Sequence, residues 1–168
     1  MLLRLFLTLS VLHTSALASA LPAPTAPLVG TSASFARAPI CRTLGCVYQG
    51  VRRFRLEGSN NPMRVYRYRL TGGTQVEVTR FDLPGQSGDG RVVTVRAQGP
   101  VTPRGARTAA LLATAASGRP VSAAQVTACW RQTSSGPQRF LVSGSFEAPS
   151  VLCGSQGRRG TLLVTLTN

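Results

Sequence analysis

The stretch RVYRYRLTGGTQVEVTRFDL, residues 64–83, indicates a β-hairpin and guides the interpretation of the first half of the chain. Polar and apolar side chains alternate on both sides of Gly72-Gly73, a pattern typical of two antiparallel strands joined by a tight turn. Successive side chains on a strand point to opposite faces. We therefore expect the tyrosines of the stretch to lie in the core with Leu70, and Arg67 and Arg69 to lie on the opposite, polar face.

The length of the turn sets the register of this hairpin. A two-residue turn would place Tyr68 opposite Glu77 and would mix apolar and polar side chains on both faces. A three-residue turn, residues 72–74, places Tyr68 opposite Val78 and Arg69 opposite Glu77, and it separates the two kinds of side chain. Because a slip of one residue moves every side chain to the other face, the three-residue register is predicted.

Similar alternation predicts strands on either side of this hairpin. The first half of the chain therefore reads as a four-stranded antiparallel meander over residues 51–57, 64–70, 75–83 and 91–97. Glycine clusters at 72–73, 85–90 and 154–160 are interpreted as turns, because no helix follows them that could present amide groups to a phosphate.

The second half has helix signals followed by strands. Thr102 can cap a helix with Pro103 at its first position, and the alanine-rich segment that follows ends at Gly118. Ser122 and Gln125 form a capping box for a second short helix over 123–131, for which a strand is the alternative.

Two C-terminal strands are expected at 139–146 and 161–167. The predicted fold class is α+β: an antiparallel meander sheet of about four strands, one or two short helices, and two C-terminal strands. The alternative is an all-β sandwich.

The N-terminus predicts export. Residues 1–20 combine Arg4, the apolar run 5–12 and the small-residue sequence Ala18-Ser19-Ala20, as a secretory signal peptide does. Residues 21–40 are rich in proline and alanine and are expected to be a flexible segment outside the core. A single disulfide-stapled domain is predicted over 41–168, in a periplasmic or secreted protein.

Four cysteines follow the signal peptide: Cys41, Cys46, Cys129 and Cys153. An even number of cysteines in an exported chain indicates two disulfides. Three pairings are possible, and proximity along the chain favours Cys41–Cys46 and Cys129–Cys153. No metal site is expected, because the cysteine spacing is unlike that of zinc sites and the mature chain lacks histidine. Trp130, beside Cys129, is expected to be a core residue.

Charge is the strongest functional signal. All 19 basic residues are arginine, only five residues are acidic, and loss of Arg4 with the signal peptide lowers the net charge from +14 to +13. Such a charge suits association with polyanions. The candidate binding residues lie on the polar strand faces: Arg53, Arg55, Arg67, Arg69 and Arg96, with Arg91 as an alternative to Arg96. The competing interpretation is a solvated surface whose charges prevent edge-to-edge aggregation.

Catalytic chemistry is poorly represented. The one histidine, His13, belongs to the signal peptide, and the chain has no lysine, which excludes histidine-based triads and Schiff-base chemistry in the mature protein. Five carboxylates remain, with no spacing that favours a catalytic pair: Glu57, Glu77, Asp82, Asp89 and Glu147. We expect neither an enzyme nor a cofactor.

The sequence therefore predicts an exported, non-enzymatic binding module. Its arginine-rich sheet face would bind nucleic acid, an acidic polysaccharide or an anionic component of the cell envelope. The alternatives are a structural or interaction protein of the envelope, and an inhibitor of an exported enzyme.

Overall fold

The computed structural model describes residues 26–55, 62–81, 90–134, 136–145 and 148–166, so the expected signal peptide lies outside it. No helix in this part of the chain is both long and apolar enough to cross a membrane. The elements follow in the order η1 (Phe35–Arg37), α1 (Pro39–Thr43), β1 (Val47–Arg55), β2 (Pro62–Arg69), β3 (Gln75–Phe81), β4 (Arg91–Pro100), α2 (Pro103–Ser117), α3 (Ala123–Gln132), β5 (Arg139–Val142), β6 (Ser150–Gln156) and β7 (Arg159–Thr165).

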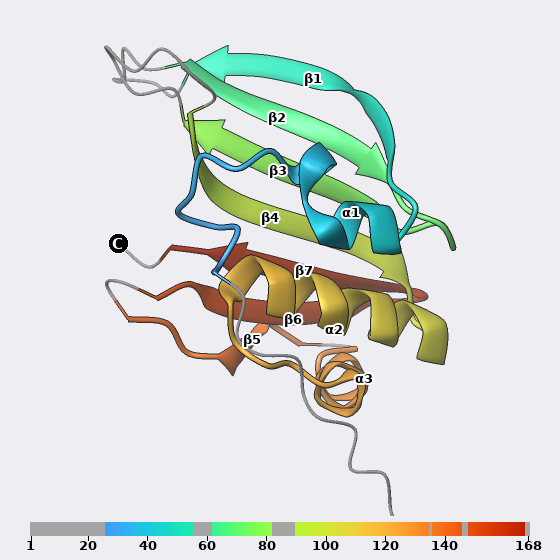
Figure 1. Cartoon of the computed structure of the whole chain (residues 1–168). Helices are drawn as coiled ribbons and strands as arrows, with labels where there is room; N and C mark the ends of the chain where they lie inside the picture. Colours follow the sequence, from blue (N-terminus) through green and yellow to red (C-terminus); the bar gives the residue numbers. More distant parts are fainter. Residues whose placement is uncertain (1–25, 56–61, 82–89, 135, 146–147, 167–168) are drawn as a thin grey trace, which may run out of the picture.

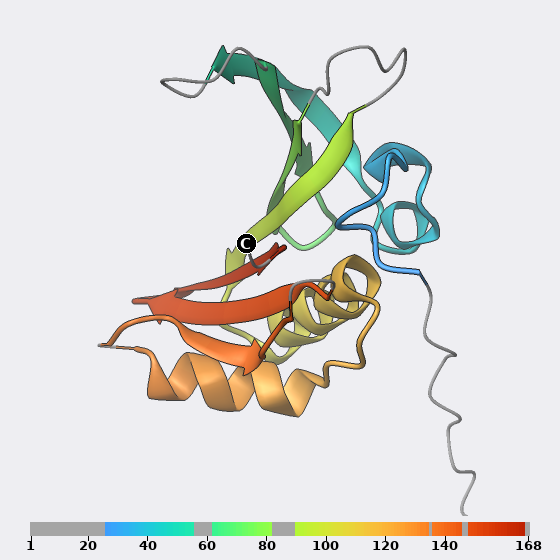
Figure 2. The same cartoon turned by 90° about the vertical axis from the view of Figure 1, so that its left-hand side faces the viewer.

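All seven strands form one antiparallel sheet, in the order β1-β2-β3-β4-β7-β6-β5. The chain builds β1 to β4 as a meander, continues through α2 and α3, and returns to place β7 beside β4 (Figure 1). The sheet is strongly twisted, and the helices lie against one of its faces (Figure 2). The α+β class is confirmed, but the sheet is larger than the predicted meander because the C-terminal strands extend it.

Two strand predictions change in the C-terminal part. Strand β5 is shorter than the predicted 139–146, of which Phe146 lies outside the described residues, and β6 was not predicted. The glycine cluster at 154–160 contains the tight turn between β6 and β7, with Gln156 paired to Arg159. The alternative of an all-β sandwich is therefore wrong, since every strand among the described residues belongs to one sheet and helices cover one of its faces.

Local capping signals correctly located both long helices. The Thr102 side chain accepts a hydrogen bond from the Gly105 amide at 3.0 Å, and α2 ends where Gly118 adopts the left-handed conformation, φ 70°. At α3, Ser122 and Gln125 exchange both hydrogen bonds of a capping box. The helical interpretation of 123–131 is confirmed, and its strand alternative is wrong.

The β2–β3 hairpin has a three-residue turn, as expected, but one residue earlier than predicted. Leu70 and Thr74 flank the turn 71–73, with the Leu70 amide bonded to the Thr74 carbonyl at 2.8 Å. Tyr68 consequently lies opposite Val76 and Arg67 opposite Glu77. The register therefore differs from the prediction by two residues, which preserves the separation of faces that the prediction required.

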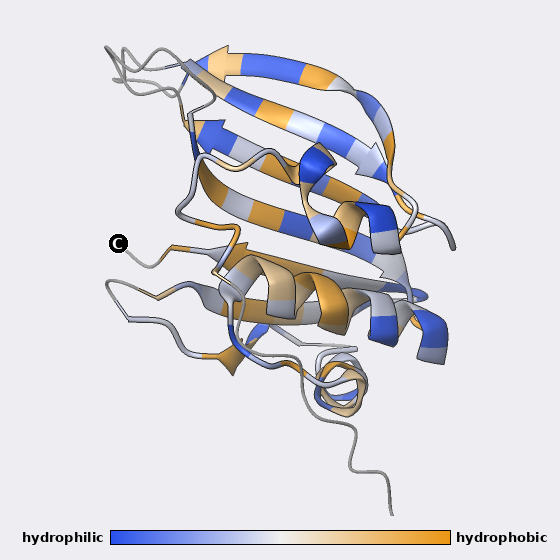
Figure 3. Ribbon diagram, in the orientation of Figure 1, coloured by the Kyte–Doolittle hydropathy of each residue, from blue (hydrophilic) through white to orange (hydrophobic). Residues whose placement is uncertain are grey.

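Hydrophobic and hydrophilic residues are interspersed along the strands (Figure 3), and the buried hydrophobic ones form the apolar layer under the helices. Tyr68 and Leu70 are buried, as predicted, together with Val76, Val78 and Val95 of the neighbouring strands. On the helical side, Leu112, Val126 and Trp130 complete this core.

The segment 28–35 also belongs to the core, contrary to the expectation of a flexible tether. Leu28, Val29 and Phe35 are buried, and Phe35 packs on Tyr68 with ring centroids 4.9 Å apart. The Val29 amide donates to the Ala116 carbonyl of α2 at 3.1 Å. Proline-rich composition indicated flexibility, but these few apolar residues provide enough burial to order the segment.

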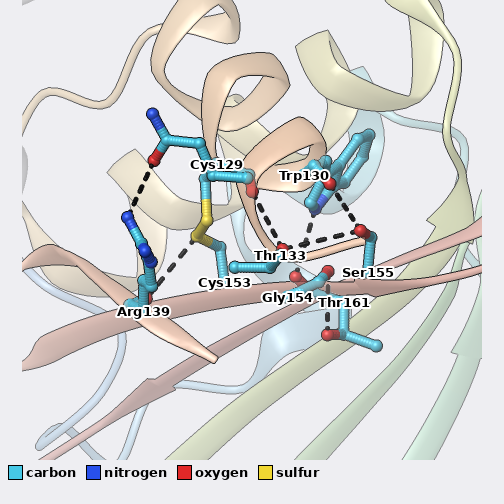
Figure 4. Close-up of a disulfide and its surroundings, with 9 residues drawn as sticks. Cys129, Trp130, Thr133, Arg139, Cys153, Gly154, Ser155 and Thr161 are labelled. Carbon is cyan, nitrogen blue, oxygen red and sulfur yellow. Dashed lines mark hydrogen bonds between the residues drawn. A yellow bond between two sulfur atoms is a disulfide. The ribbon is translucent and has the colours of Figure 1, made fainter. Parts of the chain in front are cut away.

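Two disulfides cross-link the chain next to this core, and their pairing is the predicted one. Cys41–Cys46 closes the turn after α1, with Cα atoms 5.1 Å apart. Cys129–Cys153 joins α3 to β6, with Cα atoms 6.5 Å apart (Figure 4). Next to it, the Trp130 indole nitrogen donates to the Thr161 carbonyl at 3.3 Å, and Trp130 is buried as expected.

Candidate functional site

One face of the sheet carries no helix among the residues that the structure describes, and we call it the open face (Figure 2). Side chains that alternate with the buried Tyr68, Val76 and Ala97 point to this face. Most are arginine, glutamine and threonine, so the open face is polar where it crosses β2, β3 and β4.

Three of the predicted site residues gather on the open face. Arg67 and Arg69 lie on β2 and Arg96 lies on β4, and all three are exposed. In the strand register, Glu77 of β3 lies opposite Arg67 of β2 on one side and opposite Arg96 of β4 on the other. The backbones of Arg67 and Arg96 are therefore two strand spacings apart, about 10 Å.

The other two predicted residues lie on the opposite face, which corrects the sequence prediction. Arg53 pairs with Arg64, whose side chain shares the face of Tyr66 and Tyr68, and Arg55 pairs with Pro62. In β1 it is Arg52 that points to the open face, where it lies 5.8 Å from the Phe54 ring. Strand β1 extends past the helical layer. The helices therefore do not decide which face its apolar side chains take here, and Phe54 lies on the open face.

A second row of polar side chains runs parallel to the first. Arg69 pairs with Gln75, Gln75 with Gln98, and Gln98 with Thr161. Arg159 follows two residues before Thr161, at the end of β7, and is also exposed. We define the basic cluster as Arg67, Arg69, Arg96 and Arg159.

Two shallow hollows mark this surface. One, of about 300 Å³, is lined by Gln49, Arg67, Arg69, Gln75 and Glu77. The other, of about 370 Å³, is lined by Gln75, Gln98, Arg158, Arg159 and neighbouring glycines. Gln75 lines both, so the two hollows adjoin at this side chain, and each has arginine and glutamine hydrogen-bond donors on its walls.

The electrostatics of the open face are strongly positive. Glu77 is the one acidic residue within the described ranges, which contain every arginine of the chain except Arg4. Cationic neighbours on a sheet repel one another, and a single carboxylate offsets only part of that repulsion. The basic cluster can therefore gain stability from an external anion.

Another group of arginines, on the helical face, is less well suited to an external ligand. Arg53, Arg55 and Arg64 line a hollow of about 420 Å³ at the far ends of β1 and β2. In sequence, Glu57 follows Arg55 by two positions and precedes Arg64 by seven, although Glu57 itself lies outside the described ranges. The chain thus supplies one acidic residue within two positions of this group, whereas the acidic residues closest in sequence to Arg69 and Arg159 are Glu77 and Glu147, eight and twelve positions away.

Sequence reasoning missed Arg159, Gln75 and Gln98 as members of the site. Arg159 joins it because β7 pairs with β4, a contact between segments about sixty residues apart in sequence. The alternation of their strands places the two glutamines on the same face as the arginines, and this was the signal that could have identified them. Within the described ranges no group of three or more histidine, cysteine or acidic side chains is placed to hold a metal ion.

Comparison of the chain with protein-family models, with curated proteins and with solved structures finds no match.

Proposed function

We propose that this chain is an exported, non-enzymatic binding module whose open face binds polyanions. The observation that supports this most directly is the basic cluster: four arginines on an uncovered sheet face, with Glu77 as the one carboxylate in the described part of the chain. The two disulfides are compatible with export to an oxidising compartment.

Binding would rest on charge and hydrogen bonds. A stacking platform for nucleic-acid bases needs aromatic rings on the same surface as the cations. Tyr68 is buried on the helical face, and Tyr66 shares that face. Phe54 and Phe140 do lie on the open face, but they belong to the edge strands β1 and β5 and not to the strands that carry the basic cluster. The arginine guanidinium groups and the Gln75 and Gln98 amides instead suit the oxygens of phosphate, sulfate or carboxylate groups along a polymer.

A catalytic role has little chemical support. General acid–base catalysis by a carboxylate pair needs two carboxyl groups on either side of the substrate. The open face offers Glu77 alone within the described ranges, and the chain after the signal peptide has neither histidine nor lysine. A binding role uses the groups that are abundant there.

The test compares two pairs of arginines of equal charge. Arg67→Gln with Arg69→Gln neutralises half of the basic cluster, and Arg107→Gln with Arg131→Gln removes the same charge from exposed positions on α2 and α3. The first variant should elute from immobilised heparin at lower salt than the second. With double-stranded DNA as the probe, the slope of log affinity against log salt should fall by about 2 in the first variant alone.

Equal effects of the two pairs would overturn this proposal. They would mean that total charge, and not the open face, controls retention. That result would favour the alternative of an envelope protein that its positive charge holds to anionic surface layers.

A further inference from the structure

We propose that the open face binds the surface of an anionic lipid bilayer, with Phe140 inserting beside the lipid headgroups that the basic cluster attracts. This inference rests on the proposed function and narrows its ligand to anionic lipid. A row of side chains crosses the open face from β2 to β5.

The side chains of this row are charged in its first half and apolar in its second half. Arg67 pairs with Glu77, and Glu77 pairs with Arg96, which completes the charged half. Its apolar half continues without a break as Leu163 opposite Arg96, Leu152 opposite Leu163, and Phe140 opposite Leu152. We call Phe140, Leu152 and Leu163 the apolar strip.

Phe140 is the most exposed large apolar residue in the described part of the chain, at 60% of its full surface. It belongs to β5, the strand at the edge of the sheet, while Leu152 and Leu163 are half-buried beside it. The preceding Arg139 points to the helical face, where it donates to the Gln132 side chain at 3.3 Å (Figure 4). The strip thus ends at the sheet edge with an aromatic ring in solvent.

An apolar edge next to cations is the combination that peripheral membrane binding requires. Apolar side chains enter the boundary between headgroups and acyl chains, and basic side chains are attracted to anionic headgroups. The strip is a surface feature and lines none of the three hollows described above, so it suits a bilayer surface better than a single enclosed acyl chain.

A second copy of the chain fits this face less well. Two open faces brought together would set two positively charged surfaces against each other, and like charges across an interface are unfavourable. An anionic bilayer offers the opposite charge and an apolar interior at once, which matches both halves of the row.

The test is co-sedimentation of the purified, disulfide-bonded protein with vesicles of phosphatidylcholine and phosphatidylglycerol, compared with vesicles of phosphatidylcholine alone. Binding should require phosphatidylglycerol. Phe140→Ser should weaken it about tenfold, since the variant loses most of the inserted apolar surface. Phe140→Trp should bind at least as well as the native chain, because tryptophan favours the membrane interface.

Leu111→Ser is the matched control. Leu111 is 46% exposed on α2, behind the sheet, so its loss should leave vesicle binding unchanged. Heparin retention should stay native in Phe140→Ser. Absence of binding to the mixed vesicles, equal binding to both kinds of vesicle, or native binding by Phe140→Ser would each overturn the inference. If the lipid inference failed in one of these ways but heparin retention still depended on Arg67 and Arg69, the proposed function would remain supported.

Discussion

Glu77 has opposite effects on the fold and on the candidate site. It lies between Arg67 and Arg96 in adjacent strands, and it is the one carboxylate among the residues that the structure describes. Opposite charges paired across a sheet contribute about 0.2–1 kcal/mol to stability. The same charge lowers the positive potential that the basic cluster presents to an anion. The residue thus moderates the repulsion among the arginines, and it would weaken the proposed binding of a polyanion.

We therefore predict that Glu77→Gln binds polyanions more strongly and folds less stably. The variant should elute from heparin at higher salt, and its free energy of unfolding should fall by up to about 1 kcal/mol. Gln98→Glu, which adds a carboxylate to the same face, should shift the elution in the opposite direction. Earlier elution of Glu77→Gln than of the native protein would contradict the role given to the open face.

The packing of α3 on the sheet depends on one close contact between elements. Trp130 of α3 lies directly over Gly160 of β7, where a β-carbon would overlap the indole ring. Ser155 of β6 reinforces the contact by donating to the Trp130 carbonyl at 2.5 Å (Figure 4). Because protein interiors are close-packed, the helix cannot accommodate an added methyl group here without moving.

Gly160→Ala should therefore destabilise the protein by about 1–3 kcal/mol, the usual cost of overpacking a core. Chemical denaturation would measure the loss as a lower transition midpoint with an unchanged slope. Gly136→Ala is the control, since nothing lies within 4 Å of a β-carbon at that position. A native midpoint for Gly160→Ala would mean that α3 is not held against β7 as described.

Helices and turns could be predicted from the sequence where the residues that determine them are neighbours in the chain. The caps at Thr102 and Ser122 located both long helices, and the glycines at 72–73 located the hairpin turn. Strand β6 was missed because its sequence, SVLCGSQ, has no regular alternation and contains a glycine in its interior. Alternation also located the exposed arginines of β2 and β4. It misplaced those of β1, because that strand extends beyond the helices that define a covered side.

At the scale of the whole molecule, the arrangement depends on contacts that sequence alone could not indicate. The pairing of β4 with β7 joins the two halves of the sheet and brings Arg159 to the basic cluster. Such pairings depend on the relative burial of all the strands, and no short pattern encodes them. The same applies to the N-terminal segment, whose composition indicated a tether while its few apolar residues complete the core.

The last prediction concerns this N-terminal segment. A chain that begins at Cys41, the expected domain boundary, would lose the buried side chains of Leu28, Val29 and Phe35. It would also lose the Ser32 carbonyl, which accepts a hydrogen bond from the buried Arg80 at 2.5 Å. Burial of each apolar side chain contributes about 1.5–3 kcal/mol, and the total stability of a domain is about 5–15 kcal/mol. The shortened chain should therefore be close to unfolded.

Thermal unfolding of three proteins would measure this contribution. A chain that begins at Ala26 should keep the Tm of one that begins at Leu21, whereas the chain that begins at Cys41 should lose most of its cooperative transition. Phe35→Ala in the longer chain separates packing from length, because it removes the ring that contacts Tyr68 and should cost about 3–5 kcal/mol. Equal Tm values for all of these proteins would make 41–168 the complete folding unit. A graded loss instead places the beginning of the folded unit near Leu28, so that the helical face of β2 and β3 is covered by residues that precede the first disulfide.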